Sequence, residues 1–170
     1  MATLNADYAL EIQYALVAAL SNASTGLQTA NSGAAVDVSG FDKTWEHYRK
    51  RVDFLASEGI SKGAIVWMQY LPQKPDHFGA GVVFGNKAYW DIWMGCPILT
   101  QNWPLESTEF VRLDAFRIKL KSIIFGNRTF GDKSWYTESW DTGWFVDSIR
   151  QPNLYVFKFR MEARYTSYYS

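Results

Sequence analysis

The chain has 170 residues, of which 48% are hydrophobic and 20% charged, and its 17 Lys and Arg balance 17 Asp and Glu. This composition excludes a disordered or collagen-like chain and fits a single domain. The zero net charge argues against a dedicated nucleic-acid binder, because no overall positive field attracts phosphates. The lone cysteine, Cys96, excludes an intramolecular disulfide and a cysteine-rich zinc site.

The first twenty residues carry the clearest helical period in the chain. Apolar side chains recur every fourth residue and predict a helix over 4–20, with Asn5 as its N-terminal cap. The stripe consists of Leu4, Tyr8, Ile12, Leu16 and Leu20. Two interpretations stay open: the helix docks on the domain through this stripe, or it leaves the body and enters a bilayer interface as an amphipathic segment.

Residues 21–33 are rich in Ser, Asn, Thr, Ala and Gly and contain no charge, which is typical of a flexible linker. Asn22-Ala-Ser and, much later, Asn127-Arg-Thr match the N-glycosylation motif, which occurs frequently by chance and requires a secretory route. No apolar run approaches 18 residues, and no Lys or Arg precedes an apolar core at the N-terminus. We therefore expect no membrane-spanning helix, and a soluble protein that is stored in the cytoplasm or secreted after its leader is removed.

From residue 34 onward the pattern is mainly β. Short apolar stretches separated by Gly and Pro predict strands at 34–38, 64–71, 81–84 and 88–96. Towards the C-terminus, apolar residues alternate with charged ones from Tyr155 to Glu162, as in a half-buried antiparallel strand.

Two other segments are harder to assign. The apolar residues between Val111 and Leu120 change phase, which predicts a strand with a bulge or a bend near 114–115. Residues 42–55 fit a helix or, less well, a strand. Together these patterns predict a mainly β fold: a compact antiparallel β-sandwich over residues 34–170, flanked by one or two helices that include the N-terminal one of residues 1–33.

Catalytic signals are weak. His47 and His77 lie in no metal-binding spacing, and nothing near Cys96 in the sequence would activate its thiol, which we expect to be a small buried side chain. Phosphate-binding, dinucleotide-binding and serine-hydrolase motifs are all missing. We therefore expect no enzyme, no metal and no cofactor.

Aromatic residues form the stronger signal, since Trp, Tyr and Phe make up 17% of the chain. One group centres on Trp103. We expect Pro97 and Asn102 to fix the conformation of the loop that carries Trp103, because proline restricts the backbone. A second group, Trp135, Trp140 and Trp144, alternates too raggedly for an ordinary strand and predicts a binding loop. Such indoles can enter lipid headgroups or stack on sugars, or they can simply fill the core, to which we assign Trp45 and Trp67.

Several short segments resemble a known family. They are Ala34-Ala-Val-Asp-Val with Lys43-Thr44-Trp45; Gly79-Ala80-Gly81-Val82; Pro97 with Asn102-Trp103 and Val111-Arg112-Leu113; and Gly131-Asp132 with Trp135 and Thr137. In these segments the chain resembles the actinoporins, the pore-forming cytolysins of sea anemones. Fungal fruit-body lectins share that family's β-sandwich, and Phe84-Gly-Asn-Lys-Ala-Tyr89 is similar to one of their segments.

The resemblance implies a non-enzymatic, membrane-binding cytolysin. Aromatic loops would bind lipid headgroups, the N-terminal helix would insert through its linker, and several copies would assemble, because one helix cannot enclose a water path. The alternative is a carbohydrate-binding lectin on the same fold, without pore formation. The aromatic groups give the residues expected to contact lipid or glycan, namely Pro97, Asn102, Trp103, Trp135, Trp140 and Trp144. The resemblance to the family adds Gly95 to this set.

Overall fold

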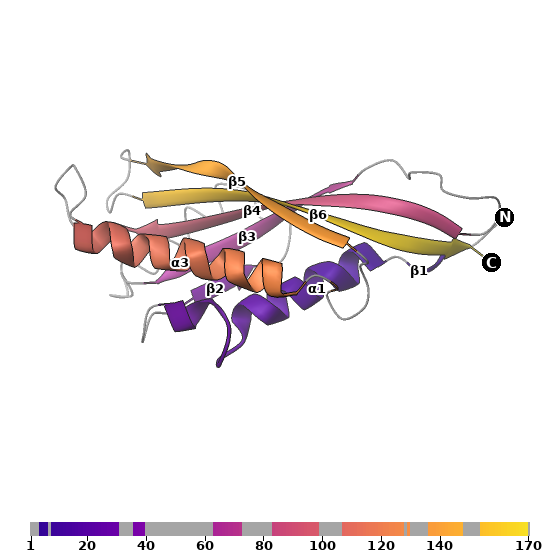
Figure 1. Ribbon diagram of the computed structural model, residues 1–170, viewed down its shortest axis with the longest axis horizontal. Coiled ribbons are helices and arrows are strands. Elements are labelled where there is room, and N and C mark those ends of the chain that lie inside the picture. Colours follow the sequence, from indigo (N-terminus) through magenta and orange to yellow (C-terminus); the bar gives the residue numbers. More distant parts are fainter. Residues whose placement is uncertain are drawn as a thin grey trace.

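The computed structural model describes residues 4–6, 8–30, 36–39, 63–72, 83–98, 107–127, 129, 136–147 and 154–169. Their elements are, in chain order, β1 (Leu4–Ala6), α1 (Tyr8–Ser21), the 3-10 helix η1 (Leu27–Ala30), β2 (Val36–Ser39), β3 (Ala64–Pro72), β4 (Val83–Pro97), α3 (Ser107–Gly126), β5 (Tyr136–Asp147) and β6 (Leu154–Tyr169). The strands form one sheet, and α1 and α3 lie on the same side of it (Figure 1).

The sheet is mixed and is built around its two longest strands. β4 and β6 pair antiparallel over the whole length of β4, from Val83↔Tyr168 to Pro97↔Leu154. β3 pairs antiparallel with the other edge of β4, and β2 is parallel to β3. The remaining edge of β6 carries β5 and the short β1, which reaches the C-terminal end of β6.

The predicted alternation in the last strand is correct. Tyr155, Phe157, Phe159 and Met161 of β6 are buried, and so are Ala88 to Cys96 at every second position of β4. These side chains form one cluster with the inner faces of the two α-helices. The core therefore lies between the sheet and the helices.

The N-terminal helix is present, but it begins later than the sequence predicts. Leu4 and Asn5 belong to β1, where Leu4 pairs with Tyr169, so Leu4 is not part of the helical stripe and Asn5 does not cap it. The helical period starts at Tyr8, and Ile12, Leu16 and Leu20 are completely buried in the core. The described arrangement is thus the docked one of the two interpretations.

Residues 22–30 form an ordered turn and a 3-10 helix, where the sequence predicts a flexible linker. The side-chain oxygen of Asn22 accepts hydrogen bonds from the backbone N–H groups of Ser24 and Thr25, both at 2.9 Å. Gly26 closes the turn so tightly that a Cβ there would lie 2.4 Å from the Asn22 carbonyl oxygen. Leu27 then enters the core. Polar composition suggested mobility, whereas these local hydrogen bonds fix the chain.

The largest difference from prediction is α3, which contains the run expected to be a bent strand. Leu113, Phe116 and Leu120 are buried while Ile118 is exposed, which is a helical and not a two-residue period. The apparent change of phase between Leu113 and Phe116 is the three-residue step of a helix.

The prediction of a sheet flanked by helices is correct in its coarse form. The described chain combines a large sheet with flanking helices. The predicted stretch at 88–96 and residues 83–84 of the stretch at 81–84 belong to the single strand β4, whereas residues 81–82 lie outside the described residues. The described strands make one sheet, so they do not by themselves make a sandwich. Residues 42–55 lie outside the described residues.

Candidate functional site

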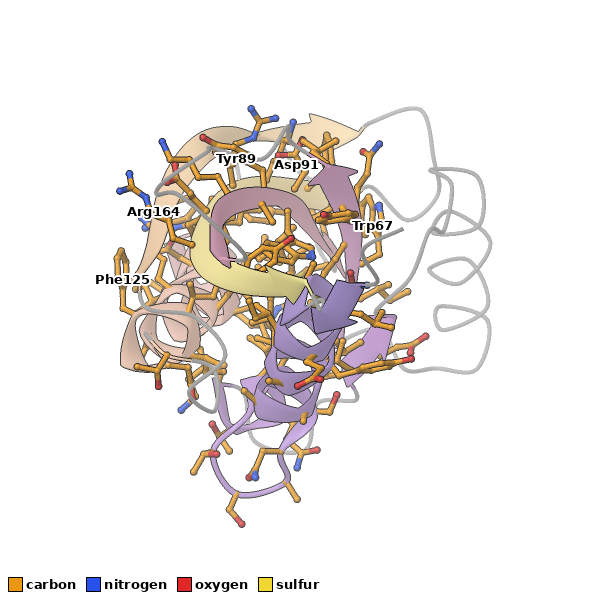
Figure 2. All side chains as sticks on the ribbon, turned by 90° about the vertical axis from the view of Figure 1, so that its right-hand side faces the viewer. Trp67, Tyr89, Asp91, Phe125 and Arg164 are labelled. Atoms are coloured by element: carbon orange, nitrogen blue, oxygen red, sulfur yellow. The ribbon has the colours of Figure 1, made fainter. Side chains whose placement is uncertain are left out.

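An apolar ridge runs along the outer side of α3. Val111, Ile118 and Phe125 are 67%, 56% and 47% exposed, and they are spaced by seven residues, which places them in one line on a helix. The half-buried Ala115 and the exposed, polar Ser122 lie between these three apolar side chains in the same line. Phe125 points away from the body of the protein (Figure 2). We call these five residues the α3 ridge.

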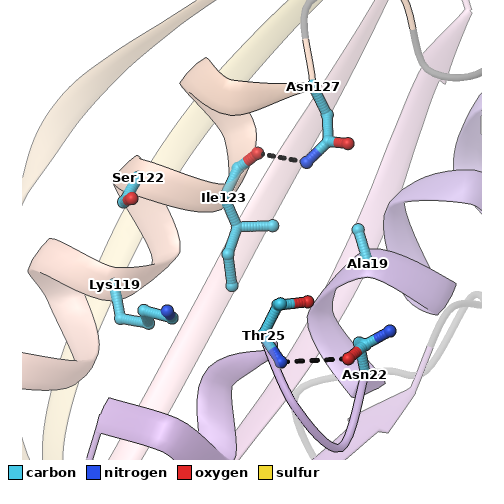
Figure 3. A pocket seen from close by; sticks show the side chains of 7 residues that line it. All are labelled: Ala19, Asn22, Thr25, Lys119, Ser122, Ile123 and Asn127. Atoms are coloured by element: carbon cyan, nitrogen blue, oxygen red, sulfur yellow. Dashed lines mark hydrogen bonds between the residues drawn. The ribbon is translucent and has the colours of Figure 1, made fainter.

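Basic side chains flank the α3 ridge. α3 contains four basic residues against two acidic ones, although the chain as a whole is neutral. Arg117 forms an ion pair with Asp114 one turn earlier, and Lys121 lies over the ring of Phe159 at 5.3 Å. On the other side, Lys119 reaches toward a pocket (Figure 3). A helix face with an apolar row between cations suits a binding partner that has an apolar interior and an anionic outer layer.

The pocket lies between α3, the C-terminal end of α1 and the turn that follows α1 (Figure 3). Its volume is about 380 Å³, and most of its lining side chains are polar. They are Asn22, Thr25, Lys119, Ser122 and Asn127, with Ala19 and Ile123 at its walls. Hydroxyl, amide and ammonium groups of this kind can bind a hydroxylated or anionic group.

α1 is fixed to the sheet by a polar contact as well as by its apolar stripe. The indole N–H of Trp90 donates a hydrogen bond of 3.1 Å to Oε1 of Gln13, and both side chains are buried. Any movement of α1 away from the sheet would take Gln13 with it and leave the indole N–H of Trp90 without its acceptor.

The face of the sheet opposite to the helices carries a compact charged cluster around Asp91, which Figure 2 shows on that face. Asp91 on β4 receives two hydrogen bonds from its cross-strand neighbour Arg160, at 2.6 and 2.9 Å, and an ion pair from Lys158 at 2.8 Å. Lys158 also lies over the ring of Trp93, which stacks on Trp67. Burial by itself would raise the pKa of Asp91, but the bonds from Arg160 and Lys158 outweigh it and hold the pKa below its usual value.

The structure separates the predicted binding residues. Gly95 lies at the centre of the sheet between Ile65 and Val156, and Pro97 is the last residue of β4. Trp140 and Trp144 do not lie on a loop: both belong to β5, opposite Arg160 and Phe157 of β6. Their ragged spacing reflects a β-bulge between Asp141 and Trp144, where Gly143 has a φ of 104°. Asn102, Trp103 and Trp135 lie outside the described residues.

The α3 ridge was missed because the run around it was interpreted as a strand. A signal was nevertheless present, since the sequence places Val111, Ala115, Ile118, Ser122 and Phe125 at alternating steps of four and three. Of the core assignments, Trp67 is confirmed as buried, and Trp45 lies outside the described residues.

Within the described part of the chain, no helix has both the length and the apolar composition needed to cross a membrane. No protein-family model and no curated protein matches this sequence.

Proposed function

We propose that this protein binds membrane surfaces through α3 and acts there as a non-enzymatic, membrane-perturbing protein. The observation that carries the proposal is the α3 ridge, a row of exposed apolar side chains bordered by basic ones on a helix whose other face is part of the core. A helix of this kind can lie in the plane of a membrane with the ridge among the acyl chains and the cations at the phosphates.

The expected strength of binding follows from the exposed areas. Val111, Ile118 and Phe125 are each about half exposed or more, so transfer of each to lipid contributes about 1 kcal/mol. Each basic residue beside an anionic leaflet adds about 1 kcal/mol, and salt screens that part. Reversible binding that is strengthened by anionic lipid is therefore expected.

Vesicle co-sedimentation tests the proposal. The variant I118S/F125S should bind vesicles of phosphatidylcholine and phosphatidylserine at least about tenfold more weakly, because it removes two of the three large ridge side chains. L10S/Y14S is the matched control, since Leu10 and Tyr14 of α1 are equally exposed, at 49% and 53%. Equal binding by the ridge variant and the wild type would overturn the proposal.

Pore formation is the second step of the proposal. α1 presents the apolar stripe that a bilayer interface could receive, namely Ile12, Leu16 and Leu20, and several copies would act together. Its release requires loss of the Gln13–Trp90 hydrogen bond and of the packing of the stripe in the core. Lipid must compensate for both, which restricts release to the membrane-bound state.

Hydrogen exchange on vesicles, combined with dye release, tests this step without altering the core. We expect the amides of Tyr8–Ser21 to change their protection when the protein binds and the vesicles to leak. Vesicle-bound protein with unchanged protection in α1 and no leakage would contradict insertion and leave surface binding alone.

A carbohydrate-binding function remains the second candidate, and the polar pocket favours it. Asn22, Thr25, Ser122 and Asn127 offer hydroxyl and amide groups that match the hydroxyl rim of a sugar. Trp103, Trp135, Trp140 and Trp144 stay predicted contacts of either a headgroup or a sugar. Binding to a glycan array without vesicle binding or leakage would decide for this function.

We further propose that the sheet is one layer of a β-sandwich. What supports this is the burial of the face that points away from the helices. Ile65 and Trp67 of β3 are 2% and 4% exposed on that face, and Val156 of β6 is completely buried. A sheet covered by helices on one side only would leave these side chains in water.

A further inference from the structure

The two N-glycosylation motifs of the sequence meet at one place in the fold. Asn22 directly follows the last residue of α1, and Asn127 directly follows the last residue of α3. Both are exposed, and both line the pocket between the two helices (Figure 3). The geometry of each acceptor amide distinguishes the two motifs.

The amide of Asn22 is held in a conformation suited to modification. Its Oδ1 accepts the backbone N–H of Ser24, the hydroxyl residue of the motif, in a turn that brings the Ser24 residue next to the amide. Its Nδ2, the atom to which a glycan is attached, makes no hydrogen bond to any residue that the structure describes.

The amide of Asn127 is arranged in the opposite way. Its Nδ2 donates a hydrogen bond of 2.7 Å to the carbonyl oxygen of Ile123, which closes the end of α3. Modification there would replace one hydrogen of a nitrogen that already serves the helix terminus. A glycan on Asn22 would also occupy the pocket that Asn127 shares.

Both arrangements are local, which matters because this modification acts on the chain as it emerges. The bonds of Asn22 and Asn127 span two to four residues. They can therefore form before the sheet assembles, and the difference between the two asparagines does not depend on the completed fold.

We propose that Asn22 is an acceptor of an N-linked glycan when the chain enters a secretory compartment, and that Asn127 is not. The donor is an oligosaccharide linked to a lipid through pyrophosphate. The bond from the anomeric carbon of the first sugar to the pyrophosphate oxygen breaks, a bond from that carbon to Nδ2 of Asn22 forms, Nδ2 gives up one proton, and the lipid pyrophosphate leaves. The inference is independent of membrane binding by α3.

The test is translation of the full chain, preceded by a cleavable leader, into endoplasmic-reticulum microsomes. Cleavage of the leader and protection from added protease identify the chains that have entered. Peptide N-glycosidase then removes the glycan and converts its asparagine to aspartate, which mass spectrometry locates.

We expect a single glycan that is lost in N22Q and in S24A and retained in the matched variants N127Q and T129A. S24A is the sharper variant, because it leaves the Asn22 turn, which uses the backbone of Ser24, in place. An imported chain without a glycan would overturn the proposal, and so would a glycan on Asn127, whether alone or together with one on Asn22.

Discussion

Asp91 is the most constrained charge among the described residues, because it faces two cations from β6 while its own side chain is almost fully buried. Its folded pKa lies below the unfolded value of about 3.9, so the stabilisation is fully present above that pH and is lost as the pH falls through the folded pKa. The ion cluster thus stabilises the β4–β6 pair at neutral pH and weakens in acid.

Replacing this carboxylate tests its role. D91N should lower the free energy of unfolding by about 3 kcal/mol at pH 7, because Lys158 and Arg160 lose their shared partner. The loss should shrink as the pH falls below about 4, because the carboxyl of the unfolded chain takes up a proton there, and it should vanish only once the folded carboxyl is protonated as well. Urea unfolding at pH 7 and pH 3 measures both values. D114N, which affects a local ion pair on α3 whose side chains are 24% and 19% exposed, is the control and should change stability by less than about 1 kcal/mol.

The hydrogen bond between Trp90 and Gln13 leads to a second prediction at the scale of single residues. W90F should cost more than the hydrogen bond itself, about 1–3 kcal/mol, since it leaves Gln13 Oε1 buried without its donor. The double variant W90F/Q13L should recover much of that loss, because both polar groups are gone. Chemical unfolding of the wild type, W90F, Q13L and W90F/Q13L gives the coupling energy between the two side chains. Strictly additive losses of stability would contradict the proposed coupling.

At the scale of elements, the apolar residues of α3 fit both the two-residue period of a strand and the period of a helix. In a strand, Phe116, Ile118 and Leu120 would share a face; in α3, Ile118 lies opposite to the other two. The helix thus places one row of apolar side chains in the core and another in solvent, and the exposed row is the surface proposed to meet the membrane.

Three alanine variants separate these arrangements. F116A and L120A should lower the free energy of unfolding by about 3 kcal/mol or more, because both side chains are completely buried. I118A should change it by less than about 0.5 kcal/mol, as expected for an exposed position. Thermal or urea unfolding compares them, and a large loss in I118A would place Ile118 in the core and remove it from the α3 ridge.

At the scale of the whole molecule, α1 is part of the same core as the sheet. One cluster includes Ile12, Leu16 and Leu20 from the N-terminal end of the chain and Met161 and Tyr165 from its C-terminal end. β1 adds backbone pairing to β6 at the far end of the sheet. Insertion of α1 into a bilayer would therefore expose the core, because α1 is part of that core and not a peripheral helix.

Deletion of residues 1–30 consequently should not leave an intact body. We expect the truncated chain to lose cooperative thermal unfolding and its near-ultraviolet circular dichroism, since it lacks four completely buried side chains of the core. L16A is the milder companion and should stay folded with a loss of about 2–5 kcal/mol. A truncated chain that melts cooperatively near the wild-type temperature would contradict this and favour an easily detached helix.

The sequence by itself determined the elements whose pattern is local and strong. The four-residue recurrence of Ile12, Leu16 and Leu20 and the two-residue alternation from Tyr155 to Met161 each fit one kind of element, because a single face is buried along the whole run. Cys96 as a small buried side chain and Trp67 as a core residue were predictable in the same way.

Only the tertiary structure decided the rest. Leu4 became a strand residue because its partner, Tyr169, comes from the other end of the chain, and no local period encodes that pairing. Trp140 and Trp144 fell within β5 because β6 accommodates a bulge beside them. The exposure of the α3 ridge likewise depended on packing: α3 has apolar residues on two faces, and its contacts with the core determined which face was buried and which was left for a partner.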